Sequence, residues 1–187
     1  MTTENKIMQY VANDATEIWE QAKAPLDNFL KETSKKPNSK LLKKNKFAGN
    51  SSYLEIGYIE AKLDQIYHGL WSWEIDSIQN IVNGVSCIGH LRVFHPVASV
   101  WITRSGVGFK EFQLSSGKSV PTPENLSKKA LERDTPIAAA EAFKNAAKKL
   151  GNTFGRHLNR GFNYGHVADE NIMDRVFGKE NAEGEKQ

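Results

Sequence analysis

The sequence of 187 residues lacks most of the features that mark secreted, membrane-spanning or metal-binding proteins. Its single cysteine, Cys87, cannot form an intramolecular disulfide, which excludes a disulfide-stabilised secreted scaffold. No window approaches the roughly 18 apolar residues of a membrane span, and the N-terminus has no uninterrupted apolar core like that of a signal peptide. The five histidines are not spaced along the chain in the way that zinc ligands are. We therefore expect a soluble intracellular protein without a metal site or membrane contact.

Catalytic motifs are also incomplete. Residues 117–119 (GKS) match the end of a phosphate-binding loop, but Phe112 stands where that loop requires glycine. Residues 60–62 (EAK) resemble the end of a nuclease motif, yet they fall in a predicted helix and no aspartate is spaced to join them. Cys87 lies in an alternating pattern, where a small buried residue is more usual than a nucleophile. We predict that the protein is not an enzyme and needs no cofactor.

The net charge of +3 hides two basic blocks. Residues 31–50 carry seven basic side chains and one acidic one, and residues 128–160 carry eight basic and three acidic ones. The two ends, residues 1–30 and 161–187, each have a net charge of −3. Basic blocks of this kind indicate a polyanion as partner, although a solvated charged surface has the same pattern.

Two helices are predicted before the centre of the chain, one on each side of a lysine-rich segment. Residues 7–31 have a helical apolar pattern, which Pro25 interrupts or kinks. Residues 31–52 are polar and contain proline and glycine, so we expect a mobile basic segment there. Between residues 53 and 70, apolar side chains recur at spacings of three and four, which is typical of an amphipathic helix that ends near Gly69.

The centre of the chain has the β-branched and aromatic pattern of strands. Three strands joined by tight turns are predicted at residues 71–82, 84–96 and 98–109, and they form an antiparallel meander. Gly106 and Gly108 are interpreted as a bulge or a tight strand end. Residues 110–130 are expected to form a loop with a short helix that starts near Glu124.

A long amphipathic helix is predicted next, with Thr135 as N-cap, Pro136 at its first position and residue 158 near its end. One stripe of this helix is apolar. The opposite side is basic and amide-rich, and its members are Lys144, Asn145, Lys148, Lys149, Asn152 and Arg156. Glu141 is the only acidic residue on that side. Gly151 and Gly155 lie beside Lys144 and Lys148 and leave room for another backbone to approach.

These elements predict an α+β fold with a β-β-β-α core, in which the antiparallel three-stranded meander packs on the long amphipathic helix and additional helices precede it. We expect three regions. Residues 1–52 form an N-terminal helical segment and a lysine-rich leader, residues 53–165 form the core, and residues 166–187 form a short helix and an acidic tail.

Four segments occur in an order that resembles the Rad-fifty-two superfamily of single-strand annealing proteins. They are YIEA at residues 58–61, WSW at 71–73, GVGF at 106–109, and AAEAFKNAAKKLGN at 139–152 followed by Gly155 and Arg156. The resemblance covers about residues 53–160, and the chain looks like a short phage or bacterial-type member. Eukaryotic members contact the recombinase through a long C-terminal extension, and we expect no contact of that kind in this short type.

The resemblance implies a non-catalytic protein that binds single-stranded DNA and anneals complementary strands in recombination and repair. Family members form an oligomeric ring, in which a deep basic groove holds the DNA backbone and leaves the bases exposed. We therefore expect self-association into a ring or filament, a single-strand-binding protein or recombinase as candidate partner, and a nucleoid-associated protein in the cytoplasm of a bacterium or phage-infected host.

The resemblance also implies candidate DNA-binding residues. Lys144 matches the groove lysine and Lys148 a basic residue one turn later, whereas Asn145 replaces the family's next basic residue. Tyr58 matches the groove tyrosine. The full set of candidates is Lys144, Lys148, Lys149, Arg156, Lys43, Lys44, Lys46, Tyr58, Lys128 and Lys129.

Some of these candidates have alternative interpretations. One lysine among residues 43, 44 and 46 would supply the basic residue that precedes the YIE motif, or the run is simply solvated. Lys128 and Lys129 lie near one lysine of a second, outer DNA site, whose other lysine is replaced here by Val85. Arg156 and Arg160 could instead bind carbonyl groups at the end of the helix.

The remaining alternatives concern the tryptophans and the function itself. Trp71, Trp73 and Trp101 are interpreted as core or subunit-interface residues rather than base-stacking platforms. A double-stranded RNA-binding module also has an α-β-β-β-α order and a basic helix, and it would prefer an A-form duplex. A metal-dependent nuclease that uses Glu60 is a further alternative, although carboxylate partners are missing.

Overall fold

The computed structural model describes residues 3–46, 49–81 and 83–160, with side chains from Thr16 onward in these ranges. Helix α1 (Thr3–Ser34) and the residues from Lys35 onward belong to two separate units, which are described one at a time. The short helix and acidic tail expected at residues 166–187 lie outside the described residues. Among the described residues, no helix combines the length and the apolar character needed to cross a membrane.

The first unit contains α1, which is longer than predicted and continuous. Pro25 lies inside the helix and does not interrupt it, so of the two expected effects only a kink stays a prediction. A proline removes one backbone hydrogen bond because it has no N–H group. The helix of 32 residues continues through Pro25 because the hydrogen bonds on both sides of it remain. Near the C-terminal end, the hydroxyl of Thr33 donates to the carbonyl oxygen of Phe29 at 3.1 Å.

The second unit begins with a hairpin where the sequence predicted a mobile segment. After a short 3-10 turn at Ser39–Leu41, strand β1 (Leu42–Asn45) pairs antiparallel with strand β2 (Ser51–Leu54). The prediction is wrong because lysines, which disfavour strands on average, are tolerated in a short exposed hairpin. The domain boundary expected at residue 52 falls inside this hairpin.

Helix α2 (Ile56–Tyr67) confirms the amphipathic helix expected between the lysine-rich segment and the sheet. It begins three residues later than predicted because β2 continues to Leu54. Ile59, Leu63 and Tyr67 form its buried face. The helix ends at His68, whose φ of 54° leads into Gly69 with a φ of 73°.

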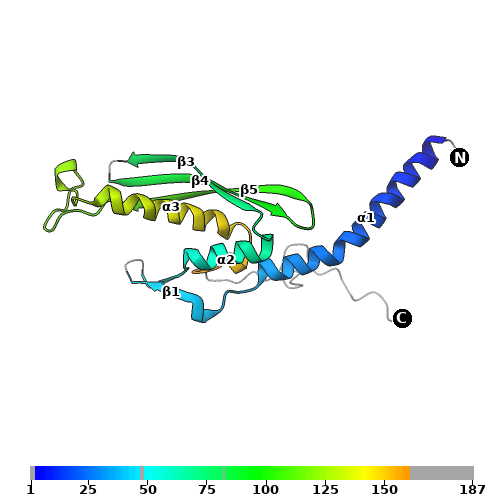
Figure 1. Cartoon of the computed structure of the whole chain (residues 1–187), viewed down its shortest axis with the longest axis horizontal. Coiled ribbons are helices and arrows are strands. Elements are labelled where there is room, and N and C mark those ends of the chain that lie inside the picture. The colour runs from blue at the N-terminus through cyan, green and yellow to red at the C-terminus, as the bar shows by residue number, and fades with distance from the viewer. Residues whose placement is uncertain (1–2, 47–48, 82, 161–187) are drawn as a thin grey trace, which may run out of the picture. The chain divides into compact units, whose positions relative to one another are not determined.

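The predicted antiparallel meander is confirmed. Strands β3 (Trp71–Ile81), β4 (Gly84–His95) and β5 (Val100–Glu111) form a sheet in the order β3-β4-β5 (Figure 1). The only register shift in these pairings lies in β3, between Ile75 and Ser77. A short 3-10 helix (Pro123–Asn125) in the following loop matches the expected helix start near Glu124.

Helix α3 (Ala130–Lys148) is the predicted long helix, but both of its ends differ from the prediction. It begins before Pro136, because the buried carboxylate of Asp134 accepts a hydrogen bond from the backbone N–H of Gln113 at 3.0 Å and holds the early turns beside the sheet. It ends at Lys148, ten residues before the expected end, and a 3-10 turn (Asn152–Phe154) follows. Gly155, with a φ of 87°, then turns the chain.

The core forms where α3 crosses one face of the sheet (Figure 1). Val85 and Cys87 from β4 pack against Ala138 and Ala142 from α3. Small residues bring helix and sheet close together. A Cβ atom at Gly106 would lie 2.0 Å from the carbonyl oxygen of Ala142.

Gly108 shows the same relationship, since a Cβ atom there would lie 2.0 Å from the carbonyl oxygen of Ala138. The two glycines therefore serve helix–sheet packing, and their interpretation as a bulge or strand end is wrong. Trp71 and Trp73 belong to this layer, with ring centroids 6.0 and 5.3 Å from that of Phe143. Both tryptophans are partly buried in this layer, and the subunit-interface alternative stays a prediction.

Candidate functional site

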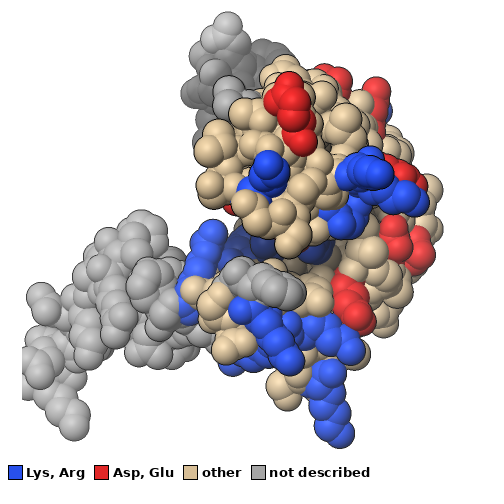
Figure 2. All heavy atoms as spheres, turned by 90° about the vertical axis from the view of Figure 1, so that its left-hand side faces the viewer, with Lys and Arg blue, Asp and Glu red and all other residues tan. Residues whose placement is uncertain are grey.

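Two adjoining hollows run along the polar side of α3, and Lys148 lines both of them. The first, of about 650 Å³, lies between α3 and the β1-β2 hairpin. The second, of about 460 Å³, lies between the end of α3 and the turn that follows it. We call the two hollows together the basic cleft, and Figure 2 shows lysine and arginine side chains gathered around a hollowed surface.

The basic cleft has a strongly uneven charge. Its basic residues are Lys44, Lys46, Lys144, Lys148, Lys149, Arg156 and Arg160. Among the residues that the structure describes, Glu141 is the only acidic one that lines either hollow. Because these residues come from the hairpin, the helix and the turn after the helix, the positive charge is created by folding and not by one continuous run. A surface of this kind attracts polyanions.

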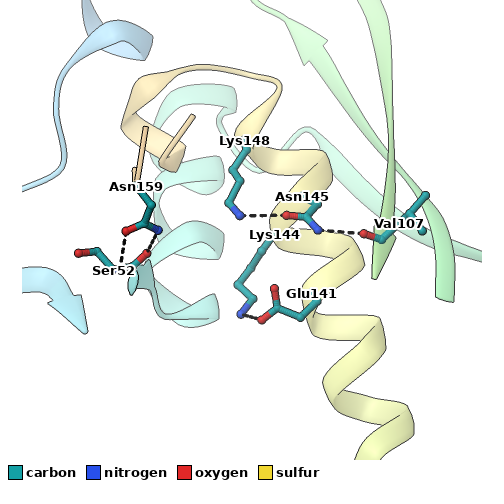
Figure 3. Close-up of polar contacts among 7 residues, drawn as sticks. All are labelled: Ser52, Val107, Glu141, Lys144, Asn145, Lys148 and Asn159. Atoms are coloured by element: carbon teal, nitrogen blue, oxygen red, sulfur yellow. Dashed lines mark hydrogen bonds and ion pairs between the residues drawn. The ribbon is translucent and has the colours of Figure 1, made fainter. Parts of the chain in front are cut away.

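Lys144 lies inside the first hollow, where its side chain is only 15% exposed. Its ammonium group forms an ion pair with the carboxylate of Glu141, three residues earlier on the helix (Figure 3). The same ammonium lies 5.4 Å from the ring centroid of Tyr53 on β2, at a distance suited to a cation–π contact. Lys144 thus connects the helix wall of the cleft with its hairpin wall.

Lys148 is positioned by a chain of hydrogen bonds that starts at the sheet (Figure 3). The amide of Asn145 donates to the carbonyl oxygen of Val107 at 2.9 Å, and its own oxygen accepts from the Lys148 ammonium at 2.9 Å. Burial lowers the pKa of Lys148, and the positive charges of Lys144 and Arg160 lower it further, against the opposing effect of Glu141. A bound anion would favour the charged form of this lysine.

Lys149 and Arg156 line the second hollow but also bind backbone carbonyl groups. The Lys149 ammonium donates to the carbonyl oxygen of Ser105 at 2.7 Å. Arg156 donates to the carbonyl oxygens of Lys148 at 3.3 Å and Lys149 at 2.6 Å. This confirms that Arg156 binds carbonyls at the end of α3. Burial lowers the pKa of Arg156, as does the positive charge of Arg104.

The hairpin contributes two of its three candidate lysines to the cleft. Lys44 and Lys46 line the first hollow, and the Lys44 ammonium donates to the hydroxyl of Ser52 at 2.8 Å. Lys43 does not line the cleft, and its ammonium lies 4.0 Å from the Glu55 carboxylate.

Asn159 holds the hairpin beside the turn that follows α3 (Figure 3). Its side-chain oxygen accepts from the backbone N–H of Ser52 at 2.7 Å, and its amide donates to the carbonyl oxygen of the same residue at 2.7 Å. The pair of bonds imitates one step of strand pairing. Asn159 therefore sets the position of the hairpin wall relative to the helix wall.

Besides Lys43, three candidates from the sequence do not line the cleft. Tyr58 is partly buried on α2, and burial raises the pKa of its hydroxyl. Lys128 and Lys129 lie at the opposite end of α3, where Lys129 is 4.0 Å from Glu132. The fifteen residues between Lys129 and Lys144 correspond to about 22 Å of helix. Val85, the position of the outer-site lysine in the family, is buried in the core.

Sequence reasoning missed Tyr53 and Asn159, which line the first hollow, and considered Arg160, which lines the second, only as a ligand of carbonyl groups. Tyr53 and Asn159 could have been found only by recognising the hairpin, because their role depends on where it lies. Trp101 is 50% exposed and so lies outside the core of this chain, and its alternative place in a subunit interface stays a prediction. The guanidinium carbon of Arg92 lies 5.3 Å from the Trp101 ring centroid.

Comparison with known proteins adds no relative to this description. No model of a known protein family matches the chain, and no curated protein matches it significantly. A functional proposal for this protein therefore depends on the basic cleft together with the sequence resemblance.

Proposed function

We propose that this protein binds single-stranded DNA along the basic cleft, without sequence preference, and anneals complementary strands in homologous recombination or repair. It does so without catalysis and without a cofactor. The observation that carries the proposal is the charge of the cleft, where seven basic side chains face one acidic side chain. The order of motifs that resembles the Rad-fifty-two superfamily supports DNA as the polyanion.

The electrostatics of the cleft suit phosphate groups. Lys144 and Lys148 are partly withdrawn from water, so their interaction with an anion is screened less than that of a fully exposed lysine. Binding would release counterions from the DNA, and the affinity would fall with rising salt concentration. Because these contacts are made to phosphates, they carry no base preference.

The position of the charges also suits annealing. The lysines of α3 lie inside the cleft, so the sugar–phosphate backbone would enter with its phosphates directed inward and its bases toward solvent. Phosphate neutralisation lowers the repulsion between two complementary strands, and a backbone held in an extended form loses less entropy when it pairs. Tyr53 at the hairpin wall offers a ring for contact with a base or sugar.

Self-association would extend the cleft over a longer strand. We propose a ring or filament of copies of this chain, with a single-strand-binding protein or a recombinase as a further partner. The protein would act on the nucleoid in the cytoplasm of a bacterium or a phage-infected host. The resemblance carries this part of the proposal.

The decisive experiment compares two double variants that each remove two positive charges. Lys144→Ala with Lys148→Ala removes charge inside the cleft, and Lys128→Ala with Lys129→Ala removes charge at the other end of α3. Fluorescence anisotropy with labelled oligothymidine would measure affinity, and strand pairing would be followed by energy transfer between labelled complementary oligonucleotides.

We expect the cleft variant to bind at least about 10-fold more weakly and to anneal slowly. Its plot of log affinity against log salt should become shallower by about 1.4, since each single-strand phosphate contact contributes about 0.7. The control variant should resemble the wild type. Equal annealing by the cleft variant and the wild type would contradict the assignment of the DNA site to the cleft. If the wild type preferred an A-form RNA duplex over single-stranded DNA in a competition assay, the protein would be the double-stranded RNA-binding alternative.

A further inference from the structure

The two edges of the three-stranded sheet differ in their hydrogen bonding. At the β5 edge, the carbonyl oxygen of Ser105 accepts from the Lys149 ammonium at 2.7 Å, and that of Val107 accepts from the Asn145 amide at 2.9 Å. Both donors come from α3. Their side chains occupy outward-facing acceptors that another strand would need, so this edge is closed to strand addition.

The β3 edge is open. Among the described residues, no strand pairs with β3 on the side away from β4 (Figure 1). Phe94 donates its N–H to the carbonyl oxygen of Leu70 at 2.9 Å, which sets the alternation of bonded and non-bonded pairs between the two strands. Beyond the register shift at Ser77, the same alternation applies. The N–H and C=O groups of Ile78 and Asn80 therefore point away from β4.

The open edge is also apolar. Ile75 and Ile78 pair with Gly89 and Cys87 of β4, on the face that α3 covers elsewhere. Helix α3 packs over β4 and β5, so these two isoleucines remain 43% and 46% exposed. An edge strand of eleven residues with unpaired backbone groups and exposed isoleucines is a template for pairing with another strand.

We propose that β3 pairs with β3 of a second copy of this chain, in antiparallel orientation, about a two-fold axis at Ile78. In this register Ile78 faces its own copy and Ser77 faces Gln79. Asp76 lies at the register shift, and its carboxylate is 4.0 Å from the His90 ring of β4. A hydroxyl opposite an amide is a compatible pair, and no two acidic residues are brought together.

Because the β5 edge is closed, the partner strand of β3 is β3 of the second copy and not β5. Pairing of β3 with β5 of the next copy would continue from copy to copy, but the side chains of Asn145 and Lys149 occupy that edge. Pairing of β3 with itself satisfies both open edges at once and stops there, as in an isologous dimer. The product is a six-stranded sheet with both α3 helices on the same face and the isoleucines of both copies between them.

This inference is independent of the proposed DNA binding, because no residue of β3 lines the basic cleft. A two-fold contact by itself gives a dimer. A ring or filament would need a second contact through a different surface.

The first test is disulfide trapping with Ile78→Cys. The only natural cysteine, Cys87, is buried, so the introduced thiol is the reactive one. Directly opposed residues in a hydrogen-bonded antiparallel pair have Cα atoms about 5.5 Å apart, within the range of a disulfide. We expect mild oxidation to convert most of the variant to a covalent dimer on a non-reducing gel. The control is Val107→Cys, at a residue of β5 that is 55% exposed, and it should remain monomeric.

The second test uses charge at the two-fold axis. Ile78→Lys and Ile78→Asp each place like charges opposite each other, so each variant alone should have a smaller mass than the wild type in light scattering after gel filtration. An equimolar mixture should regain the wild-type mass, because lysine then faces aspartate. Circular dichroism would verify folding. A monomeric wild type, an unchanged mass of Ile78→Lys, or trapping no stronger than that of Val107→Cys would overturn the proposal.

The two proposals can fail separately. Ile78→Lys should retain the ability of each copy to bind a short oligothymidine, whereas Lys144→Ala with Lys148→Ala should retain the disulfide trapping of Ile78→Cys. Loss of trapping with normal DNA binding would overturn only the β3 contact.

Discussion

Lys144 and Glu141 form an ion pair within the basic cleft, so the one acidic residue among the described lining residues neutralises a largely buried cation. A phosphate group that binds Lys144 must compete with this carboxylate. The proposed DNA site thus contains its own counter-charge, which weakens binding and favours release of annealed strands.

Glu141→Gln should therefore strengthen binding of single-stranded DNA. The substitution keeps the shape of the side chain and removes the competing charge, and we expect about 2- to 5-fold tighter binding, in line with partly exposed ion pairs. The matched control is Glu132→Gln, which breaks the pair with Lys129 outside the cleft. Anisotropy titrations at constant salt would measure both variants. Unchanged or weaker binding by Glu141→Gln would show that Lys144 does not contact the DNA.

Lys148 should make DNA binding sensitive to alkaline pH. Burial lowers its pKa, and phosphate binds the protonated form, so affinity should begin to fall with rising pH below the usual lysine range near 10.4. Lys148→Arg keeps its charge over that range and should show a flatter profile. Anisotropy titrations between neutral pH and pH 10 would compare the two proteins, and parallel profiles would contradict a role for the Lys148 charge.

The same lysine should reduce stability at neutral pH. A lysine whose pKa is lower in the folded state costs stability while it is protonated, because the unfolded chain binds that proton more strongly. The cost is fully present below the lowered pKa and disappears as pH rises through it toward the unfolded value. Lys148→Met should therefore raise the urea midpoint at pH 7 while it weakens DNA binding. A lower midpoint would mean that the bond to Asn145 outweighs the cost of burial.

Gly108→Ala should disrupt the contact between helix and sheet. The new Cβ would lie 2.0 Å from the carbonyl oxygen of Ala138 and 2.5 Å from the N atom of Ala142, and both are backbone atoms of a packed helix. We expect a loss of about 3 kcal/mol in the free energy of unfolding, or failure to fold. Gly57→Ala is the control, since its Cβ meets no atom within 4 Å and a helical alanine should stabilise by up to about 1 kcal/mol. Equal urea midpoints for the two variants would contradict the close packing.

Asn159→Gly should loosen the hairpin without unfolding the core. Glycine adopts the φ of 63° found at Asn159, so the substitution removes only the two side-chain bonds to Ser52. We expect faster amide exchange in residues 51–54 and about 3- to 10-fold weaker DNA binding, because two lost bonds free one wall of the cleft. Hydrogen exchange read by mass spectrometry would measure the first effect. Unchanged exchange in β2 would show that other contacts hold the hairpin.

The central sheet and the two flanking helices were predictable because their signals are local. The alternation of apolar residues in β3, β4 and β5, the Asn83-Gly84 turn and the spacing of Ile59, Leu63 and Ile66 depend only on neighbouring residues. The start of α3 was not predictable in this way. Thr135 and Pro136 form a good helix start, but the buried bond of Asp134 to Gln113, twenty-one residues away, favours an earlier one.

The sequence by itself determined the α+β order of elements, the polar side of α3 and the position of Lys144 and Lys148 on it. Only the tertiary structure decided which segments surround those lysines and which neighbouring basic side chains bind backbone groups instead. A lysine-rich segment that looks mobile pairs with residues 51–54 and becomes a wall of the cleft, while Lys149 and Arg156 bind carbonyl groups. The physical reason is that charge and periodicity follow from residues close together in the chain, whereas a cleft and an open sheet edge depend on which distant backbone groups meet.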